Sequence, residues 1–335
     1  MPIEQIRLGI VGCGLIVRNV HARDLLRMPE AQVVGLCDPD RASLDLIMNA
    51  HPSLKNVPAF SDYRELLDKV PMDGVLISTP HTFHFPQIGE ALERRLHVLS
   101  EKPLVVRSDH ARKLIELRDK HRRVLLVAYQ RHYQSGYRYL RKAVSDGRLG
   151  RLNMIVGHQS ENWLTANASR WRTDPALSGG GVMADVMSHI LEALLWITDL
   201  QPEEVYARFD NRGTRVEVIA ALSIRFAGGA IASISTGGDT RRARFHEEIS
   251  LCGDSGALQL VWEAGPAVTE WAPEKRVVPE SEWPPASSPT RNFANAILGK
   301  EEIEVPAEWA LKVTLLKEAA WESGRTGRPV KVMGV

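Results

Sequence analysis

Short apolar runs alternate with amphipathic stretches through the first 128 residues of the chain. This alternation constrains the fold more than any other feature, because strands separated by helices form βαβ units with right-handed crossovers and build a parallel sheet. Helical patterns such as FPQIGEALERRL and DHARKLIELRDKH separate the runs. The predicted strands are Ile6–Val11, Gln32–Cys37, Gly74–Ser78, His97–Leu99 and Val124–Ala128. This half is therefore predicted to be a doubly wound α/β domain.

The alternation stops after Tyr129, and longer strand-like runs then follow one another without helices between them. Consecutive strands indicate an antiparallel or mixed sheet, and the Gly-Gly pair in FAGGAIASI predicts a hairpin. One helix is expected over YRYLRKAVSDGRLG, ending near Gly147, and a long one over about Val182–Ile197. The predicted strands of this half are Leu152–His158, Glu204–Phe209, Val216–Phe226, Ala230–Thr236 and Glu247–Cys252.

A chain of 335 residues exceeds what one core usually organises, so two domains are expected, at residues 1–128 and 129–335. The net charge of +1 gives no reason to expect nucleic acid or a membrane surface as a partner. No apolar run approaches the ~20 residues that span a bilayer, and the first run enters a glycine turn directly, so no cleavable signal is predicted. Cys13, Cys37 and Cys252 lack metal-ligand spacing. A cytoplasmic protein without a metal site is expected.

The pair Gly12-x-Gly14 follows the first predicted strand and opens a predicted helix, which is the context of a dinucleotide-binding turn. Gly12 permits a tight turn, and Gly14, without a Cβ, lets the backbone approach a diphosphate. The free N–H groups of the following helix then face the anion. Val17 replaces the third small residue of such turns. Its size predicts a wider gap or a shifted helix there.

Asp38 ends the second predicted strand, at the distance from the glycines where a carboxylate accepts hydrogen bonds from ribose hydroxyls. A carboxylate there repels a 2′-phosphate, so NAD is expected as the cofactor. Arg41, one turn later, could offset this charge, and NADP therefore stays an alternative. Asp38 could also cap the helix that follows, and the two roles are compatible.

Lys102 lies in HVLSEKPL, directly after a predicted strand whose carboxyl end faces the ligand crevice of such a sheet. Pro103 disfavours helix for the preceding residue and holds it extended. A lysine there could donate hydrogen bonds to a substrate hydroxyl beside a nicotinamide. The alternative is a surface lysine in a turn.

The stretch SGGGVMADVMSHILEALLWI places three glycines before an apolar helical pattern. Asp185 and His189 are four residues apart and therefore share a face of this helix. Histidine is the usual proton carrier near neutral pH. A purely structural hydrogen bond between the two side chains is the alternative.

Together these motifs resemble the glucose–fructose oxidoreductase, inositol dehydrogenase and rhizopine-catabolism (Gfo/Idh/MocA) family of NAD(P)-dependent oxidoreductases. The resemblance extends over nearly the whole chain and includes GIVGCGLI, VVGLCDPD, LISTPHTFH, HVLSEKPL, AYQRHY and WRTDPALSGGGVMADVMSHILEALLWI. It implies an N-terminal Rossmann domain and a C-terminal α+β domain with a large open, mainly antiparallel sheet. The exposed face of that sheet commonly forms a subunit interface, so a homodimer or homotetramer is expected. The implied reaction is hydride transfer between nicotinamide and a hydroxyl or keto carbon of a sugar, inositol or related polyol.

The resemblance also assigns site residues. It implies that Lys102, Asp185 and His189 are catalytic, with His189 moving the hydroxyl proton and the other two orienting the alcohol. The residues expected to bind the cofactor are Gly12, Gly14, Leu15, Ile16, Asp38, Thr79, Pro80, His84, Glu101, Lys102 and Gln130.

The stretch SENWLTANASRWRTDP precedes the three glycines and should border the substrate. Trp163 or Trp171 could stack on a sugar face, although plain packing is an equal alternative for each indole. Asn162 and Arg172 could bind hydroxyls or a carboxylate. Since no basic cluster marks a phosphate pocket, an uncharged sugar or polyol is expected.

Two other functions fit parts of this pattern. One is an NAD-dependent glycoside hydrolase or lyase that oxidises its substrate only transiently. The other is a nucleotide-sensing regulator without turnover, which has no need of the proton carrier that His189 would supply.

Overall fold

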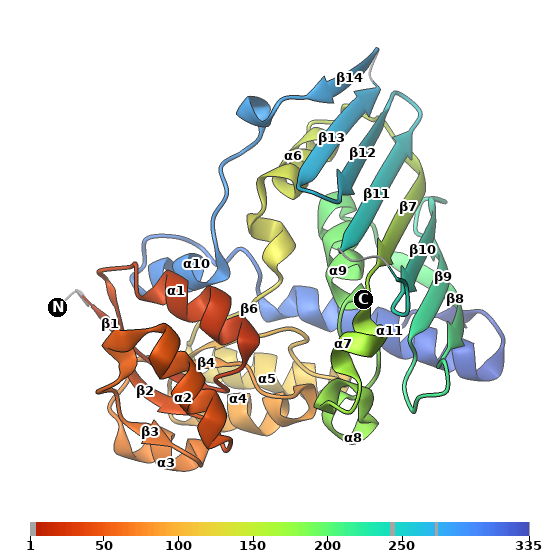
Figure 1. Ribbon diagram of the computed structural model, residues 1–335. Helices are drawn as coiled ribbons and strands as arrows, with labels where there is room; N and C mark the ends of the chain where they lie inside the picture. The colour runs from red at the N-terminus through yellow and green to blue at the C-terminus, as the bar shows by residue number, and fades with distance from the viewer. Residues whose placement is uncertain (1–4, 242–244, 272–273, 335) are drawn as a thin grey trace. The chain divides into compact units, whose positions relative to one another are not determined.

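The computed structural model describes residues 5–241, 245–271 and 274–334 (Figure 1). The chain divides into two compact units. The first unit comprises residues 1–105, 109–129 and 287–310, and the second comprises residues 106–108, 130–286 and 311–335. The expected division at residues 1–128 and 129–335 stays a prediction. The units differ from it mainly at residues 287–310, which pack with the amino-terminal part of the chain.

The sheet of the first unit has six parallel strands in the order β3-β2-β1-β4-β5-β6. The strands are β1 (Ile6–Val11), β2 (Ala31–Cys37), β3 (Ala59–Phe60), β4 (Gly74–Ile77), β5 (His97–Ser100) and β6 (Leu125–Val127). The strand order reverses between β1 and β4, and ligands of doubly wound sheets bind at such a reversal. The predicted parallel sheet is confirmed.

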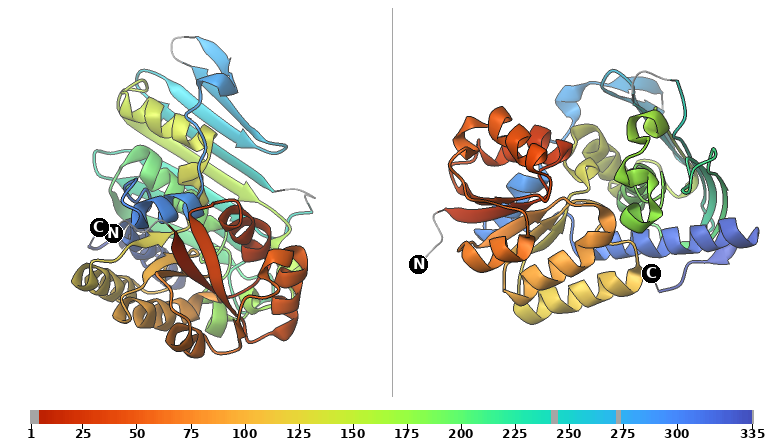
Figure 2. Two further views of the ribbon diagram at one scale, coloured as in Figure 1. Left: turned by 90° about the vertical axis from the view of Figure 1, so that its left-hand side faces the viewer. Right: turned by 60° about the horizontal axis from the view of Figure 1, so that its bottom comes forward.

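Helices lie on both faces of this sheet (Figure 2). They are α1 (Ala22–Leu25), α2 (Arg41–Ala50), α3 (Tyr63–Lys69), α4 (His84–Glu93), α5 (Ser108–His121) and α10 (Pro289–Ile297). Helix α10 comes from the far end of the sequence and packs against α1, β5 and β6. Its Phe293 and Ala294 belong to the same buried core as Ile10 and Leu25.

His97, the first residue of β5, is surrounded by hydrogen-bond donors. The backbone N–H of Val124 donates to its Nδ1 at 3.0 Å, and Arg123 Nη1 lies 3.2 Å from its Nε2. Burial, and then the charge of Arg123, lower the pKa of His97 to about 4. Such an environment favours the neutral imidazole.

Acidification is therefore expected to destabilise the first unit through His97. The unfolded chain binds the proton at its ordinary pKa of 6.5 and the folded chain only at about 4. The free energy of unfolding should thus fall by about 2–3 kcal/mol between pH 7 and pH 4 from this residue alone. His97→Asn retains an acceptor for Val124 and removes the titration. Denaturant unfolding at both pH values should show a smaller fall in the variant, and equal falls would contradict the assignment.

The second unit contains a nine-stranded sheet in the order β14-β13-β12-β11-β7-β10-β9-β8-β15. Strands β7 and β10 pair in parallel, and the other neighbours are antiparallel. The strands are β7 (Leu152–Ser160), β8 (Pro202–Asp210), β9 (Ile219–Phe226), β10 (Ile231–Gly237), β11 (His246–Gly253), β12 (Ala257–Trp262), β13 (Pro266–Trp271), β14 (Lys275–Val278) and β15 (Val330–Lys331). The predicted open, mainly antiparallel sheet is confirmed. The β9–β10 hairpin turns at Gly228 and Gly229, whose φ angles are 84° and 92°.

Helices α6 (Ser135–Ser145) and α9 (Met187–Thr198) pack on one face of this sheet. Gly157 of β7 permits the close approach of α9, since a Cβ there would lie 2.9 Å from Ile190 Cδ1. The remaining helices of this region are α7 (Trp163–Asn167), α8 (Pro175–Ser178) and α11 (Ala307–Thr326). Within residues 5–241, 245–271 and 274–334, no helix combines the length and apolar character needed to cross a bilayer.

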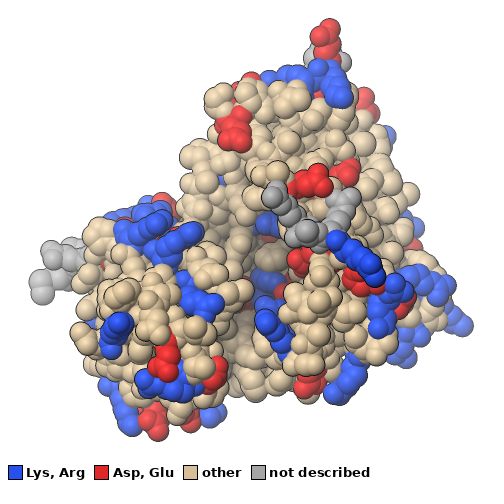
Figure 3. Space-filling model, in the orientation of Figure 1, with Lys and Arg blue, Asp and Glu red and all other residues tan. Residues whose placement is uncertain are grey.

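Acidic and basic side chains are interspersed on the molecular face in Figure 3, in keeping with a net charge of +1. Among the described residues, no group of three His, Cys, Asp or Glu side chains is placed to hold a metal ion.

Candidate functional site

The glycine turn after β1 has the backbone form that a diphosphate requires. Gly12 has a φ of 90°, and a Cβ there would collide with the carbonyl of Ser78 at the end of β4. A Cβ on Gly14 would instead meet nothing within 4 Å among the described residues. Gly12 is therefore required by the protein's own packing, whereas Gly14 leaves open space next to the start of a helix.

The helix after this turn begins at Leu15, passes through a π-helical segment, η1 (Val17–His21), and continues as α1. Val17 is fully buried in this π-helical segment, at the position where such turns usually carry a smaller residue. Leu15 is 63% exposed and Ile16 packs partly against the core. The first turn of the helix thus presents Leu15 to the surroundings of the glycine turn.

Asp38 lies beside the glycine turn. Its Oδ2 accepts the backbone N–H of Cys13 at 2.8 Å, and its Oδ1 accepts that of Asp40 at 2.9 Å. Asp40, not Asp38, caps α2 by accepting from the two backbone N–H groups at residues 42 and 43. The capping alternative for Asp38 is therefore wrong. Arg41 pairs with Asp45 at 3.0 Å, so its charge is directed to that carboxylate.

His84 joins the loops that follow β4 and β5. Its Nε2 lies 2.9 Å from the carbonyl oxygen of Thr79 and its Nδ1 lies 2.8 Å from that of Pro103. Burial lowers the pKa of His84, although the two carbonyls raise it in part. The side chain is 0% exposed. The ring fills the space between the two loops, and its expected contact with the cofactor stays a prediction.

Glu101 precedes Lys102 and is 7% exposed. Its Oε1 lies 2.8 Å from His21 Nε2, and its Oε2 accepts the backbone N–H of Lys102 at 3.0 Å. Burial alone would raise the pKa of Glu101, but the hydrogen bond and charge of His21, together with Lys102, hold it below its ordinary value. Both carboxylate oxygens thus have partners within the protein, and the expected cofactor contact of Glu101 stays a prediction.

Lys102 itself is half-buried and is followed by a cis peptide bond to Pro103. Thr79 and Pro80 are half-buried at the end of β4, and the Thr79 hydroxyl donates to Gln87 Oε1 at 2.6 Å. The glycine turn, Asp38, Thr79 and Lys102 thus all lie in the first unit, at the carboxyl ends of β1, β2, β4 and β5.

The helix that follows the three glycines of the second unit begins later than the sequence predicts. Gly179 ends α8 with a φ of 70°, and a Cβ on Gly181 would collide with the carbonyl of Glu217. Glu217 Oε1 accepts the backbone N–H groups of Gly181 at 2.9 Å and Met183 at 3.3 Å. Residues 182–186 form turns, and α9 begins only at Met187. The predicted start at Val182 is wrong.

Asp185 lies in these turns and is 5% exposed. Its Oδ2 accepts Trp163 Nε1 and Arg172 Nε, each at 2.8 Å. His189 is half-buried in the first turn of α9. Asp185 is thereby fixed to the segment that follows β7, the same segment expected to border the substrate.

The residues expected to contact the substrate or the nicotinamide differ in their exposure to solvent. Trp163 is 3% exposed and donates to Asp185, which supports packing over sugar stacking for this indole. Trp171 is half-buried beneath the guanidinium of Arg172, 4.3 Å from its ring centre. Asn162 is exposed just before α7. Gln130 is half-buried in the short helix η4 (Gln130–Tyr133), in the second unit.

A buried ion pair next to Gln130 was not found from the sequence. Arg131 Nε and Nη2 lie 3.1 and 3.2 Å from the two oxygens of Glu247, which is 0% exposed. Tyr137 and Gln159 also donate to this carboxylate. Burial lowers the pKa of Arg131, but Glu247 and Tyr137 raise it above its ordinary value overall. No sequence pattern signals such a pair, because 116 positions separate its two members.

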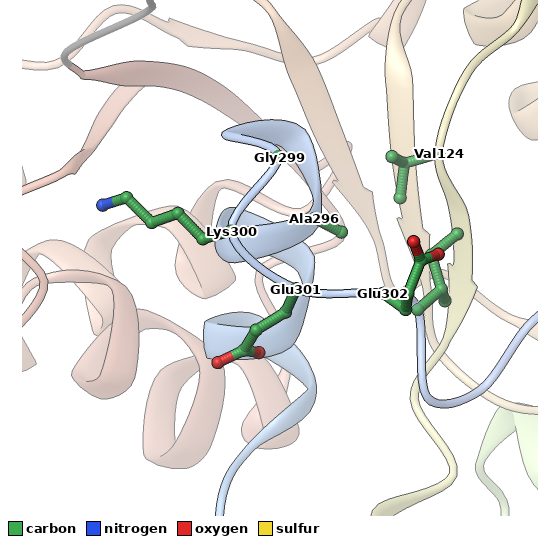
Figure 4. A pocket seen from close by; sticks show the side chains of 7 residues that line it. Val124, Ala296, Gly299, Lys300, Glu301 and Glu302 are labelled. Carbon is green, nitrogen blue, oxygen red and sulfur yellow. The ribbon is translucent and has the colours of Figure 1, made fainter.

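A cavity of about 370 Å³ lies in the first unit at the end of α10. The close-up in Figure 4 shows the Lys300 side chain pointing away from the other labelled residues. Glu301 Oε1 accepts Asn295 Nδ2 at 2.8 Å. The cavity is lined by Val124, Ala296, Gly299, Lys300, Glu301, Glu302 and Ile303. None of the expected site residues is among them.

Comparison with known families gives two matches. Residues 6–129 match the model of an oxidoreductase family with an NAD-binding Rossmann fold. Residues 137–259 match the model of the GFO/IDH/MocA C-terminal domain.

Among curated proteins, inositol 2-dehydrogenase of Rubrobacter xylanophilus is 25% identical over 343 residues, covering 98% of this chain and 94% of the relative. D-glucoside 3-dehydrogenase of Escherichia coli is 24% identical and covers 99% of both chains. The rhizopine catabolism protein MocA of Rhizobium meliloti is 28% identical, but the match spans only 60% of this chain and 59% of MocA.

Among solved structures, the WlbA dehydrogenase from Bordetella pertussis, in complex with NADH and UDP-GlcNAcA, superposes with a TM-score of 0.84 and 25% identity. The match covers 99% of this chain and 100% of that one. Aldose-aldose oxidoreductase from Caulobacter crescentus also has a TM-score of 0.84, at 21% identity over 98% of this chain and 99% of that one, which supports the fold alone.

Proposed function

The chain belongs to the GFO/IDH/MocA family of oxidoreductases and carries that family's NAD-binding Rossmann domain; on this basis we propose that it oxidises a hydroxyl-bearing carbon of a sugar, inositol or related polyol. The observation that carries the proposal is the open space at Gly14, beside the carboxylate of Asp38. Relatives named for inositol and D-glucosides match nearly the whole chain. Since two of the relatives and both solved structures reported above are named dehydrogenases or oxidoreductases, the hydrolase and regulator alternatives are not favoured.

The residues present fit a dinucleotide. The backbone of the glycine turn and the N–H groups at the start of its helix would hold the diphosphate, and Asp38 would accept from the ribose hydroxyls. The Asp38 carboxylate would repel a 2′-phosphate, which favours NAD over NADP, and Arg41 forms an exposed pair with Asp45. When bound, the nicotinamide supplies the acceptor for a hydride.

We assign the remaining roles to three side chains. The ammonium group of Lys102 donates a hydrogen bond to the substrate hydroxyl. His189 accepts the hydroxyl proton during oxidation and returns it in the reverse direction. Asp185, held by Trp163 and Arg172, orients the alcohol and balances charge.

The proposed substrate class rests on the charge next to Asp185. Arg172, in the segment expected to border the substrate, is paired with Asp185. Its guanidinium group is thus engaged within the protein, which favours an uncharged sugar or polyol over a phosphorylated one. Trp171 and Asn162 are the remaining candidates for contact with its ring and hydroxyls.

The function is tested by incubating the protein with NAD or NADP and a panel of inositols, sugars and sugar alcohols, and recording the absorbance of the reduced nucleotide. Reduction of NAD with at least one polyol is expected. Product formation without net NADH would instead support the hydrolase or lyase alternative, and binding of NADH without turnover of any panel member would support the regulator.

A second copy of the chain is the proposed occupant of the open face of the nine-stranded sheet. Met154 and Ile231 are register partners on β7 and β10, and they are 39% and 49% exposed. Adjacent apolar side chains on a sheet face favour association.

The double variant Met154→Lys and Ile231→Lys is expected to convert the proposed homodimer or homotetramer into a smaller species, because two charges on each copy would face each other across the interface. Leu46→Lys, at another exposed apolar position on α2, is the matched control and should leave the mass unchanged. Light scattering after size exclusion measures the mass. A monomeric unchanged protein would contradict the proposal.

A further inference from the structure

Both sides of the Lys102 backbone are held by buried side chains of the first unit. On one side, Glu101 Oε2 accepts the Lys102 N–H at 3.0 Å. On the other side, His84 Nδ1 lies 2.8 Å from the carbonyl oxygen of Pro103. The turn that carries Lys102 is thus fixed before and after the lysine.

The side chains that make these two contacts also reach other loops. Glu101 Oε1 is bound by His21, the last residue of the π-helix that follows the glycine turn. The pKa of Glu101 lies below its ordinary value, so the carboxylate is ionised and only accepts, and His21 Nε2 must be the donor. His84 Nε2 lies 2.9 Å from the carbonyl oxygen of Thr79 after β4, and the neutral ring donates to one of its two carbonyl neighbours at a time. The three side chains therefore connect the loops after β1, β4 and β5.

These hydrogen bonds matter energetically because the three side chains are buried. His21 and His84 are 0% exposed and Glu101 is 7% exposed. A hydrogen bond in such a place is stronger than one in water, and losing one partner leaves a buried polar atom unsatisfied. The same burial leaves these side chains almost no surface for direct contact with a substrate.

We infer that His21, Glu101 and His84 form a positioning network, which sets the place of the Lys102 ammonium group relative to the glycine turn without taking part in the chemistry. This inference rests on the proposed role of Lys102. It predicts that changes within the network act on kcat through a misplaced lysine, since displacements of about 1 Å can cost about 100-fold in rate.

The test compares His84→Gln and Glu101→Gln with His51→Gln. His51 Nε2 also bonds a backbone carbonyl, that of Arg18 in the same π-helix at 2.7 Å, but it does not touch the turn that carries Lys102. Both network variants should lower kcat about 10- to 100-fold, while KM and the Kd for NADH stay within about threefold. His51→Gln should leave all three values within about threefold.

A second readout does not require turnover. The rate at which acetic anhydride modifies Lys102, relative to exposed Lys113, is measured by peptide mass spectrometry. This ratio should change in both network variants and not in His51→Gln. If the ratio and kcat match the unchanged protein in folded Glu101→Gln, the network has no positioning role, even should His84→Gln fail to fold. If no polyol is turned over, the proposed function fails, and the labelling ratio still decides the inference.

Discussion

Replacing Lys102 by alanine is expected to reduce kcat about 10²- to 10⁴-fold, with the Kd for NADH within about threefold of the unchanged protein. The reason is that the ammonium group acts on the substrate hydroxyl, whereas the diphosphate is held by backbone groups of the glycine turn. The loss should therefore appear in turnover and not in nucleotide binding. The measurement combines steady-state kinetics on a polyol substrate with NADH fluorescence titration.

Lys113→Ala is the matched control, since this lysine is exposed on α5 and takes no part in the proposed site. It should turn over at the unchanged rate. Turnover of Lys102→Ala at that same rate would remove the lysine from the mechanism. A parallel loss of NADH binding would instead assign it to the cofactor.

The second large effect is expected from the buried pair of Arg131 and Glu247. Glu247→Gln leaves the guanidinium of Arg131 without its counter-charge in an interior site. Breaking a buried pair from one side typically costs about 3–5 kcal/mol of the free energy of unfolding. Replacing both residues by methionine should cost less than either single change, because no uncompensated charge remains. Denaturant unfolding followed by circular dichroism measures each variant.

An exposed pair provides the control for this experiment. Lys69 and Glu65 are 2.8 Å apart on α3, with side chains 63% and 56% exposed. Glu65→Gln should change the free energy of unfolding by less than about 0.5 kcal/mol, because water screens the pair. If Glu247→Gln behaved like Glu65→Gln, the buried pair would contribute little to stability.

The sequence predicts the strands of the first sheet because each is an apolar run bounded by helical patterns. Strand β3 was missed, since two residues form no periodic pattern. The start of α9 was also missed. The turns at residues 182–186 are as apolar and buried as the helix itself, so the hydrophobic pattern does not distinguish them from its first turn.

The candidate site likewise contains features that the sequence predicts and features that it does not. Asp38 and the glycine turn follow from local order, because strand, turn and carboxylate stand at characteristic spacings. The contact of His21 with Glu101 cannot be predicted from local order, because 80 positions separate the two residues. His84 illustrates a second limit: the family resemblance identifies the position, but only burial shows that its ring faces the interior.

The packing of α10 also affects how the first unit folds during translation. All six strands of the first sheet have left the ribosome once Val127 has emerged, but Phe293 of their core has not yet been synthesised. The last strand, β6, also forms hydrogen bonds with residues near the end of the chain. Val127 N–H donates to the carbonyl of Val305, and Leu126 forms a bridge with Pro306. During translation this sheet therefore keeps an unpaired edge and an uncovered apolar face until nearly the whole chain is complete. A nascent chain halted before α10 would depend on chaperones to keep that face from aggregating.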